Sequence, residues 1–207
     1  MFSDEVPAYV AVKGRLSNAA HVLMSYPALL MGSRFVDEAM RQPDIPRLLR
    51  NFWDLDARKL VEPPSGFSVS AFTEKVIERF ADPAIKDQLL RVAGDGASKI
   101  VVFHGETIAQ LIANGGDVTR EAFLIACFRR YLDGVDENGV SFEIFEPRVS
   151  GTDRERMRAG GPLAVLDIDA FRGLNLRRSS RFVAAYERLS QQLEAQGTAA
   201  TLAQLLI

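Results

Sequence analysis

Three polar residues of different chemistry lie close together near the N-terminus, in the stretch KGRLSNAAH: Lys13, Asn18 and His21. On a helix, Asn18 and His21 are three positions apart and therefore project from neighbouring points on one side. Lys13 lies eight residues before His21, about 12 Å along a helix axis, and its long side chain can span much of that gap. The spacing predicts a potential base and two hydrogen-bond donors around one space.

This set of groups suits the oxidation of a secondary alcohol. A lysine whose pKa is lowered by desolvation can take the hydroxyl proton, which an arginine cannot do near neutral pH. The Asn18 amide and an N–H of His21 can hold the alcohol oxygen as negative charge builds, and each such donor stabilises the transition state by about 2.7–4 kcal/mol. The same residue types also occur on ordinary solvated helix faces, so spacing alone leaves both interpretations open.

A second pair of cations, Arg91 and Lys99, repeats the eight-residue offset across RVAGDGASK. An arginine and a lysine beside a glycine-rich break could bind a polar, hydroxyl-rich or carboxylate-bearing ligand. Two solvated charges are the alternative interpretation.

The composition narrows the class of protein. Lys and Arg total 25 against 27 Asp and Glu, for a net charge of −2, so neither nucleic acid nor an anionic membrane is an expected partner. The first ten residues lack the pattern of a signal peptide, and no apolar run of about 18 residues occurs, which favours a cytoplasmic protein without a membrane span. The single Cys127 is expected to be buried; it excludes an internal disulfide and, without other ligand spacing, argues against a structural zinc site, so no metal is expected.

Helical periodicity dominates the chain and predicts a mainly α, multi-helical domain with at most a minor hairpin. A helix over 16–26 should bend or end at Pro27, and Asp82 and Pro83 have the spacing of an N-cap and a first helical position, which predicts a helix over 83–93. Residues 141–147 alternate like a single strand, and residues 150–162 have the composition of a charged loop. The other expected helices cover residues 33–43, 44–61, 70–80, 98–114, 117–133, 163–171, 179–197 and 201–207. We expect residues 1–147 to form a helical core and 148–207 a C-terminal helical subdomain.

The stretch KGRLSNAAH is similar to the K-x4-N-x2-H signature of the long-chain mannitol dehydrogenase family, which comprises polyol dehydrogenases and hexuronate reductases. The resemblance continues in the family's order through RFVDEAM, ERFADPAIKDQLLRVAGDGASKI, FRRYLDGVDENG and SSRFVAAYERL. It implies the multi-helical C-terminal domain that is also seen in 6-phosphogluconate dehydrogenase-like proteins.

The resemblance also implies roles for single residues. Lys13 would be the general base, Asn18 and His21 would orient and polarise the alcohol or carbonyl oxygen, and Arg91 and Lys99 would contact substrate hydroxyls. Some mannitol-oxidising members carry a histidine three residues after the arginine, where this chain has Gly94. This departure weakens the expectation of mannitol in particular and leaves a polyol, keto-sugar or sugar acid as the substrate.

The resemblance implies NAD or NADP as the cofactor, bound by a Rossmann-type domain that precedes the signature. Here the signature begins about a dozen residues into the chain, and the nearest glycine-rich stretch, GDGASK at 94–99, ends in lysine and lies between expected helices rather than after a strand. We therefore expect the nucleotide-binding domain to be absent and the cofactor to be bound elsewhere, with a separate nucleotide-binding domain or subunit as a candidate partner.

The expected function is the substrate-binding and catalytic domain of an NAD(P)-dependent polyol or sugar-acid oxidoreductase that is inactive in isolation. The alternative is a non-catalytic helical interaction or dimerisation module, a truncated remnant of the family.

Overall fold

The protein is mainly α-helical. The computed structural model describes residues 5–207, and 72% of the chain is helical with no sheet among those residues. The α-helices are α1 (Val6–Val12), α2 (Ala19–Leu30), α3 (Val36–Arg41), α4 (Asp44–Asn51), α5 (Val69–Ala81), α6 (Leu89–Ala93), α7 (Gly96–Ala113), α8 (Thr119–Tyr131), α9 (Gly151–Ala159) and α10 (Ser180–Leu205). The π-helical segments are η1 (Lys13–Asn18) and η2 (Phe52–Ala57), and the 3-10 segments are η3 (Arg58–Leu60), η4 (Pro162–Asp167), η5 (Asp169–Leu174) and η6 (Leu176–Arg178). The predicted fold class is confirmed, and none of the described helices combines the length and apolar composition needed to cross a membrane.

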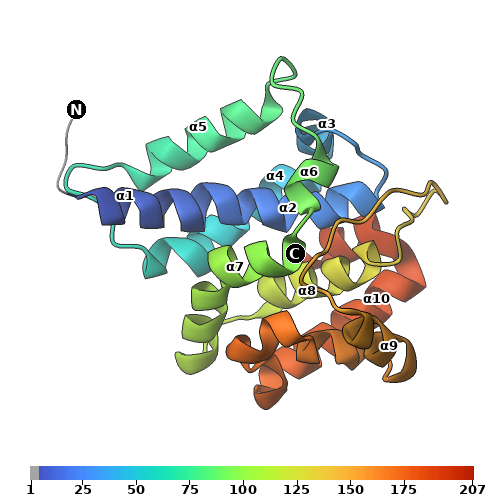
Figure 1. Ribbon diagram of the computed structural model, residues 1–207. Helices are drawn as coiled ribbons and strands as arrows, with labels where there is room; N and C mark the ends of the chain where they lie inside the picture. The colour runs from blue at the N-terminus through green and yellow to red at the C-terminus, as the bar shows by residue number, and fades with distance from the viewer. Residues whose placement is uncertain (1–4) are drawn as a thin grey trace.

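One long helical rod runs through the molecule. Figure 1 shows α1, η1 and α2 following one another without a break, with α5 on one side and α7 on the other. Every residue of α2 except His21 is buried, because α4, α6, α7 and α8 surround this helix. Pro27 was predicted to bend or end the helix but lies inside α2, which continues to Leu30. Burial on all sides offsets the backbone hydrogen bond that a proline removes.

The C-terminal helices share the core of the rest. α8 and α10 form the most extensive helix pair in the described chain, and Phe123, Phe128, Phe182 and Tyr186 are all buried. These side chains belong to the same hydrophobic cluster as the buried residues of α2. The predicted division between 1–147 and 148–207 stays a prediction.

The predicted helix over 83–93 is wrong in its first half. α5 ends at Ala81, the chain then turns, and α6 begins only at Leu89. The carboxylate of Asp82 accepts a hydrogen bond from the Ala84 N–H at 2.9 Å, so Asp82 stabilises a local turn rather than capping a helix. Lys86 has a φ of 52°, which breaks helical continuity.

The predicted loop over 150–162 is also wrong, because residues 151–159 form α9. The Ser150 Oγ accepts from the Asp153 N–H at 3.0 Å, and the Asp153 carboxylate accepts from the Ser150 N–H at 3.0 Å. This reciprocal pair is a capping box, a start signal that the charged composition of the segment obscured.

The predicted strand over 141–147 does not form a ladder. Among the described residues, its backbone pairs only through an isolated bridge between Val135 and Ser141. Its end is fixed differently: the Phe145 carbonyl accepts from the Asp95 N–H at 2.7 Å, and the Glu146 side chain is buried.

Candidate active site

The segment that carries Lys13 and Asn18 is a π-helical turn. The Ala19 N–H donates to the Gly14 carbonyl, five residues back, so the turn contains one residue more than an α-helical turn. One carbonyl of this wide turn accepts a hydrogen bond from another segment. The Trp53 Nε1–H donates to the Leu16 carbonyl at 2.8 Å, which ties η1 to η2. Such turns occur often at functional sites.

His104 contacts the carbonyl of Ala19, the first residue of α2. Its Nε2 lies 3.0 Å from the Ala19 oxygen, and its Nδ1 lies 2.9 Å from an oxygen of Glu121. Both side chains are fully buried. Because both ring nitrogens face oxygens, the ring and the carboxyl must hold two protons between them, as imidazolium with carboxylate or as imidazole with carboxylic acid. His104, on α7, is thus a packed structural residue that supports the start of α2.

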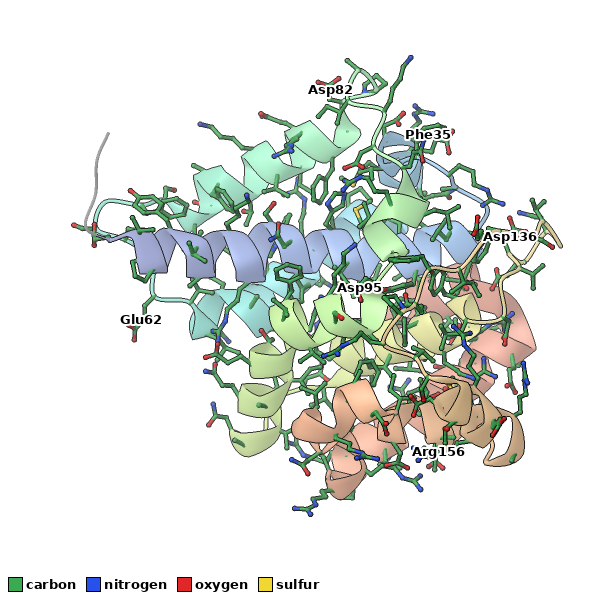
Figure 2. The ribbon with its side chains drawn as sticks, in the orientation of Figure 1. Phe35, Glu62, Asp82, Asp95, Asp136 and Arg156 are labelled. Atoms are coloured by element: carbon green, nitrogen blue, oxygen red, sulfur yellow. The ribbon has the colours of Figure 1, made fainter. Side chains whose placement is uncertain are left out.

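Lys13, Asn18, His21 and Arg91 line one cavity of about 230 Å³. It lies between the helical rod, the end of α5 and the turn before α6; Asp82 at its rim is labelled in Figure 2. The other residues of its wall are Ser17, Val36, Asp37, Arg79, Phe80, Ile85 and Asp87.

Lys99 lines an adjoining cavity of about 210 Å³ that shares Asn18, His21 and Arg91 with the first. The structure therefore groups the five predicted site residues around two neighbouring spaces with a common wall. It does not place Lys13 and Lys99 in the same cavity.

His21 is the residue of α2 that lines both cavities. Its ring stacks on Phe80 with 4.4 Å between centroids, and its Nε2 lies 3.6 Å from a carboxylate oxygen of Asp87. That separation exceeds hydrogen-bond range, and Nε2 has no hydrogen-bond partner among the described residues. Burial lowers the pKa of His21 to about 4, against the opposing effect of Asp87. At neutral pH the ring is therefore neutral and carries one N–H.

Arg91 and Lys99 are both held by protein groups. The Arg91 guanidinium binds both carboxylate oxygens of Asp87, with Nη2 at 2.6 and 2.8 Å. The Lys99 ammonium donates to the carbonyls of Arg91 and Val92 at 3.1 and 2.8 Å, and burial lowers its pKa. Two of its three N–H groups are used in this way, which leaves one for a ligand.

Lys13 is exposed, as is Arg91, whereas Asn18, His21 and Lys99 are partly buried. The described residues do not provide the desolvation that a general-base role requires.

Asp87 is the site residue that sequence reasoning missed. It pairs with Arg91 and faces His21, and so connects two of the predicted residues. The signal was present, since an acid four residues before an arginine is a common helical ion-pair spacing.

The glycine turn at 94–96 does not fit the phosphates of a dinucleotide. The Gly96 and Ala97 N–H groups, which would cradle a phosphate, donate to the two carboxylate oxygens of Glu146 at 2.8 and 3.1 Å. Within residues 5–207, no group of three or more His, Cys, Asp or Glu side chains lies close enough together to hold a metal ion.

Comparison with known proteins relates this geometry to a family. A family model described as the mannitol dehydrogenase C-terminal domain matches residues 5–194. Mannitol 2-dehydrogenase of Phaeosphaeria nodorum is 32% identical over 200 residues, which cover 97% of this chain and 35% of that protein. The polyol:NADP oxidoreductase of Gluconobacter oxydans is 35% identical over 170 residues, which cover 82% of this chain and 35% of that protein. The chain thus spans about a third of the length of these relatives.

Two solved structures have the same fold over nearly all of the chain. Mannitol 2-dehydrogenase of Pseudomonas fluorescens, in a ternary complex with NAD and D-mannitol, matches with a TM-score of 0.89 and 35% identity, covering 100% of this chain and 42% of that one. D-sorbitol dehydrogenase in its substrate-free form matches with a TM-score of 0.90 and 31% identity, covering 95% of this chain and 41% of that one. The chain therefore belongs to the mannitol dehydrogenase family of oxidoreductases and corresponds to its C-terminal domain.

Proposed function

We propose that the chain is the substrate-binding and catalytic domain of an NAD(P)-dependent oxidoreductase that interconverts a polyol or sugar acid with its ketone. The observation that carries the proposal is the common cavity of Lys13, Asn18 and His21, in which His21 is neutral at pH 7 and has an unpartnered ring nitrogen. A buried polar atom without a partner is costly, and a substrate oxygen would relieve that cost.

Each residue has a distinct part in the proposed reaction. Lys13 takes the hydroxyl proton during oxidation and returns it during reduction. The Asn18 amide and the single N–H of neutral His21 donate to the same oxygen, whose negative charge grows as the proton leaves. Arg91 and Lys99, on the adjoining wall, bind the other hydroxyls or a carboxylate of the substrate.

NAD or NADP would accept the hydride from the substrate carbon. Because the glycine turn of this chain does not fit the cofactor, we assign cofactor binding to a separate nucleotide-binding domain or subunit. All five proposed site residues lie within 1–147, which we propose as the catalytic part, with 148–207 as its support. The lone buried Cys127 is in keeping with a cytoplasmic location.

A non-catalytic interaction module is the second candidate. It is favoured by exposed apolar side chains on one side of α1, where Val6 is 59% and Val10 64% exposed. A docking surface for a nucleotide-binding domain would have the same character, so these valines do not separate the two functions.

The test is reconstitution. The purified chain is assayed for NAD(P)H production from a panel of polyols, alone and with a nucleotide-binding domain from a family relative. We expect no turnover by the chain alone and turnover after the addition, with loss of at least about a hundredfold in Lys13→Met, the size typical of a general acid–base residue. Lys75→Met, an exposed lysine on α5, is the matched control.

Two outcomes would contradict the proposal. Turnover by the chain alone would refute the assignment of the cofactor to another part. Reconstituted turnover that Lys13→Met leaves unchanged would refute the catalytic role of the cavity.

A further inference from the structure

Glu146 is a buried carboxylate outside the cavities that nevertheless binds the turn between the two cation-bearing helices. Its side chain is 5% exposed, and its two oxygens accept from the Gly96 and Ala97 N–H groups at the start of α7. An ionised carboxylate at a helix N-terminus is also favoured by the helix dipole. Asp95, which precedes these amides, is labelled in Figure 2 where α7 begins.

The turn is held from a second side by the same segment and by α2. The Asp95 N–H donates to the Phe145 carbonyl at 2.7 Å, and the Tyr26 hydroxyl donates to the Ala93 carbonyl at 3.2 Å. At Gly96 there is no room for a Cβ, which would collide with the Tyr26 hydroxyl and the Glu146 carboxylate. The turn therefore fits closely against Glu146 and Tyr26, so a change at either one moves it.

This turn sets the distance between the two cations. Arg91 lies on α6, immediately before the turn, and Lys99 lies in the first turn of α7. The Lys99 ammonium reaches back across the turn to the carbonyls of Arg91 and Val92. A shift of the α7 start relative to the α6 end would move Lys99 away from those carbonyls and from the cavity that it shares with Arg91.

We propose that Glu146 is a positioning residue for the Arg91–Lys99 pair: its carboxylate holds the α6–α7 turn, and its protonation loosens that turn. Polyol binding by this pair rests on the proposed function. The effect of Glu146 on the turn does not depend on it. A protonated carboxyl keeps one good acceptor oxygen, so one of the two amides loses its partner on protonation.

This change falls near neutral pH. Burial raises the pKa of Glu146 to about 7, against the opposing effect of the two amide hydrogen bonds. Asp95 raises this pKa and Lys99 lowers it, while the hydroxyls of Tyr26 and Tyr131 face the same carboxylate. The turn is held by both oxygens above neutrality and by one below it.

The first measurement follows the turn by NMR in the whole chain without ligand, from about pH 6 to about pH 8. We expect the amide protons of Gly96 and Ala97 to titrate with a midpoint near neutrality, and the side-chain signals of Arg91 Nε and Lys99 Cε to follow with the same midpoint. Both titrations should vanish in Glu146→Gln and persist in Glu143→Gln, the matched control, which removes an exposed carboxylate of the same segment. Amide shifts that do not change with pH would overturn the proposal, and so would amide shifts that titrate while the Arg91 and Lys99 signals stay constant. The wild-type titration decides this even if a variant fails to fold.

The second measurement is the affinity of the chain for a polyol such as D-mannitol at the two ends of that range. We expect affinity to fall about fivefold at the acidic end, the effect of one lost hydrogen bond, and to be weak and independent of pH in Glu146→Gln. If the polyol affinity is independent of pH while the Arg91 and Lys99 signals titrate, Glu146 does not control ligand binding and that part of the proposal is refuted. Absence of polyol binding at any pH would count against the proposed function, and the ligand-free titration would still decide the role of Glu146.

Discussion

The buried pair of His104 and Glu121 allows a prediction that distinguishes hydrogen bonding from charge. Both nitrogens of the His104 ring face oxygens, so the pair must hold two protons. In Glu121→Gln, the new amide N–H can donate to Nδ1 while Nε2–H continues to donate to the Ala19 carbonyl. Each of the two hydrogen bonds of the His104 ring then still contains one proton. We expect this variant to lose no more than about 1 kcal/mol of unfolding free energy.

Glu121→Leu has nearly the same volume but leaves Nδ1 without a partner in a fully buried site. An unsatisfied buried polar group costs about 1–3 kcal/mol. For a chain of 207 residues, each kcal/mol corresponds to about 2–4 °C in melting temperature, so the leucine variant should melt up to about 10 °C lower.

The assay is thermal and urea unfolding of the wild type and both variants, followed by circular dichroism. Equal losses in the glutamine and leucine variants would refute the reasoning, because they would show that the charge of Glu121, rather than the protons between the two groups, stabilises the start of α2.

Three further predictions concern the site and the turn that carries it. Trp53→Phe leaves the Leu16 carbonyl of η1 without its donor, so unfolding free energy should fall by about 1–3 kcal/mol in urea titrations, and an unchanged midpoint would contradict that role. The NMR signals of His21 should stay constant from about pH 8 down to about pH 5 and titrate near pH 4, and Asp87→Asn should lower that midpoint, since Asp87 raises the pKa. The folded-state pKa of His21 lies below the unfolded value of 6.5, so the unfolded chain binds the proton more tightly. Up to about 3 kcal/mol of unfolding free energy should therefore be lost as pH falls from neutrality towards 4. A His21 midpoint near 6.5 would refute both the titration and the stability prediction.

The sequence was informative where a residue type and a helical period acted together. The spacing of Asn18 and His21 predicted a common side, and both line the same cavities. The apolar stripe predicted the helix that became α2, and the aliphatic neighbours of Cys127 predicted its burial.

What the sequence did not predict depends on contacts between distant segments. The Leu16 carbonyl of the π-helical turn accepts from the indole of Trp53, 37 residues away, so no local pattern could show this contact. Likewise, the role of Glu146 exists only because its segment folds back over the amides of Gly96 and Ala97, about 50 residues earlier. The false helix start at Asp82 shows the reverse case, in which a sound local signal was satisfied by a turn instead.

The wide turn of η1 also fixes how α1 is rotated about the axis of the rod. Winding the same residues, 13 to 18, as regular α-helix would rotate everything before them by about 100° relative to α2, the rotation that one α-helical residue adds. Lys13 would then leave the wall that it shares with Asn18, and the apolar side chains of Val6 and Val10 would turn to another side of the molecule. The wide turn thus sets both the orientation of the outer surface of α1 and the alignment of the inner cavity, so a change in its winding alters both.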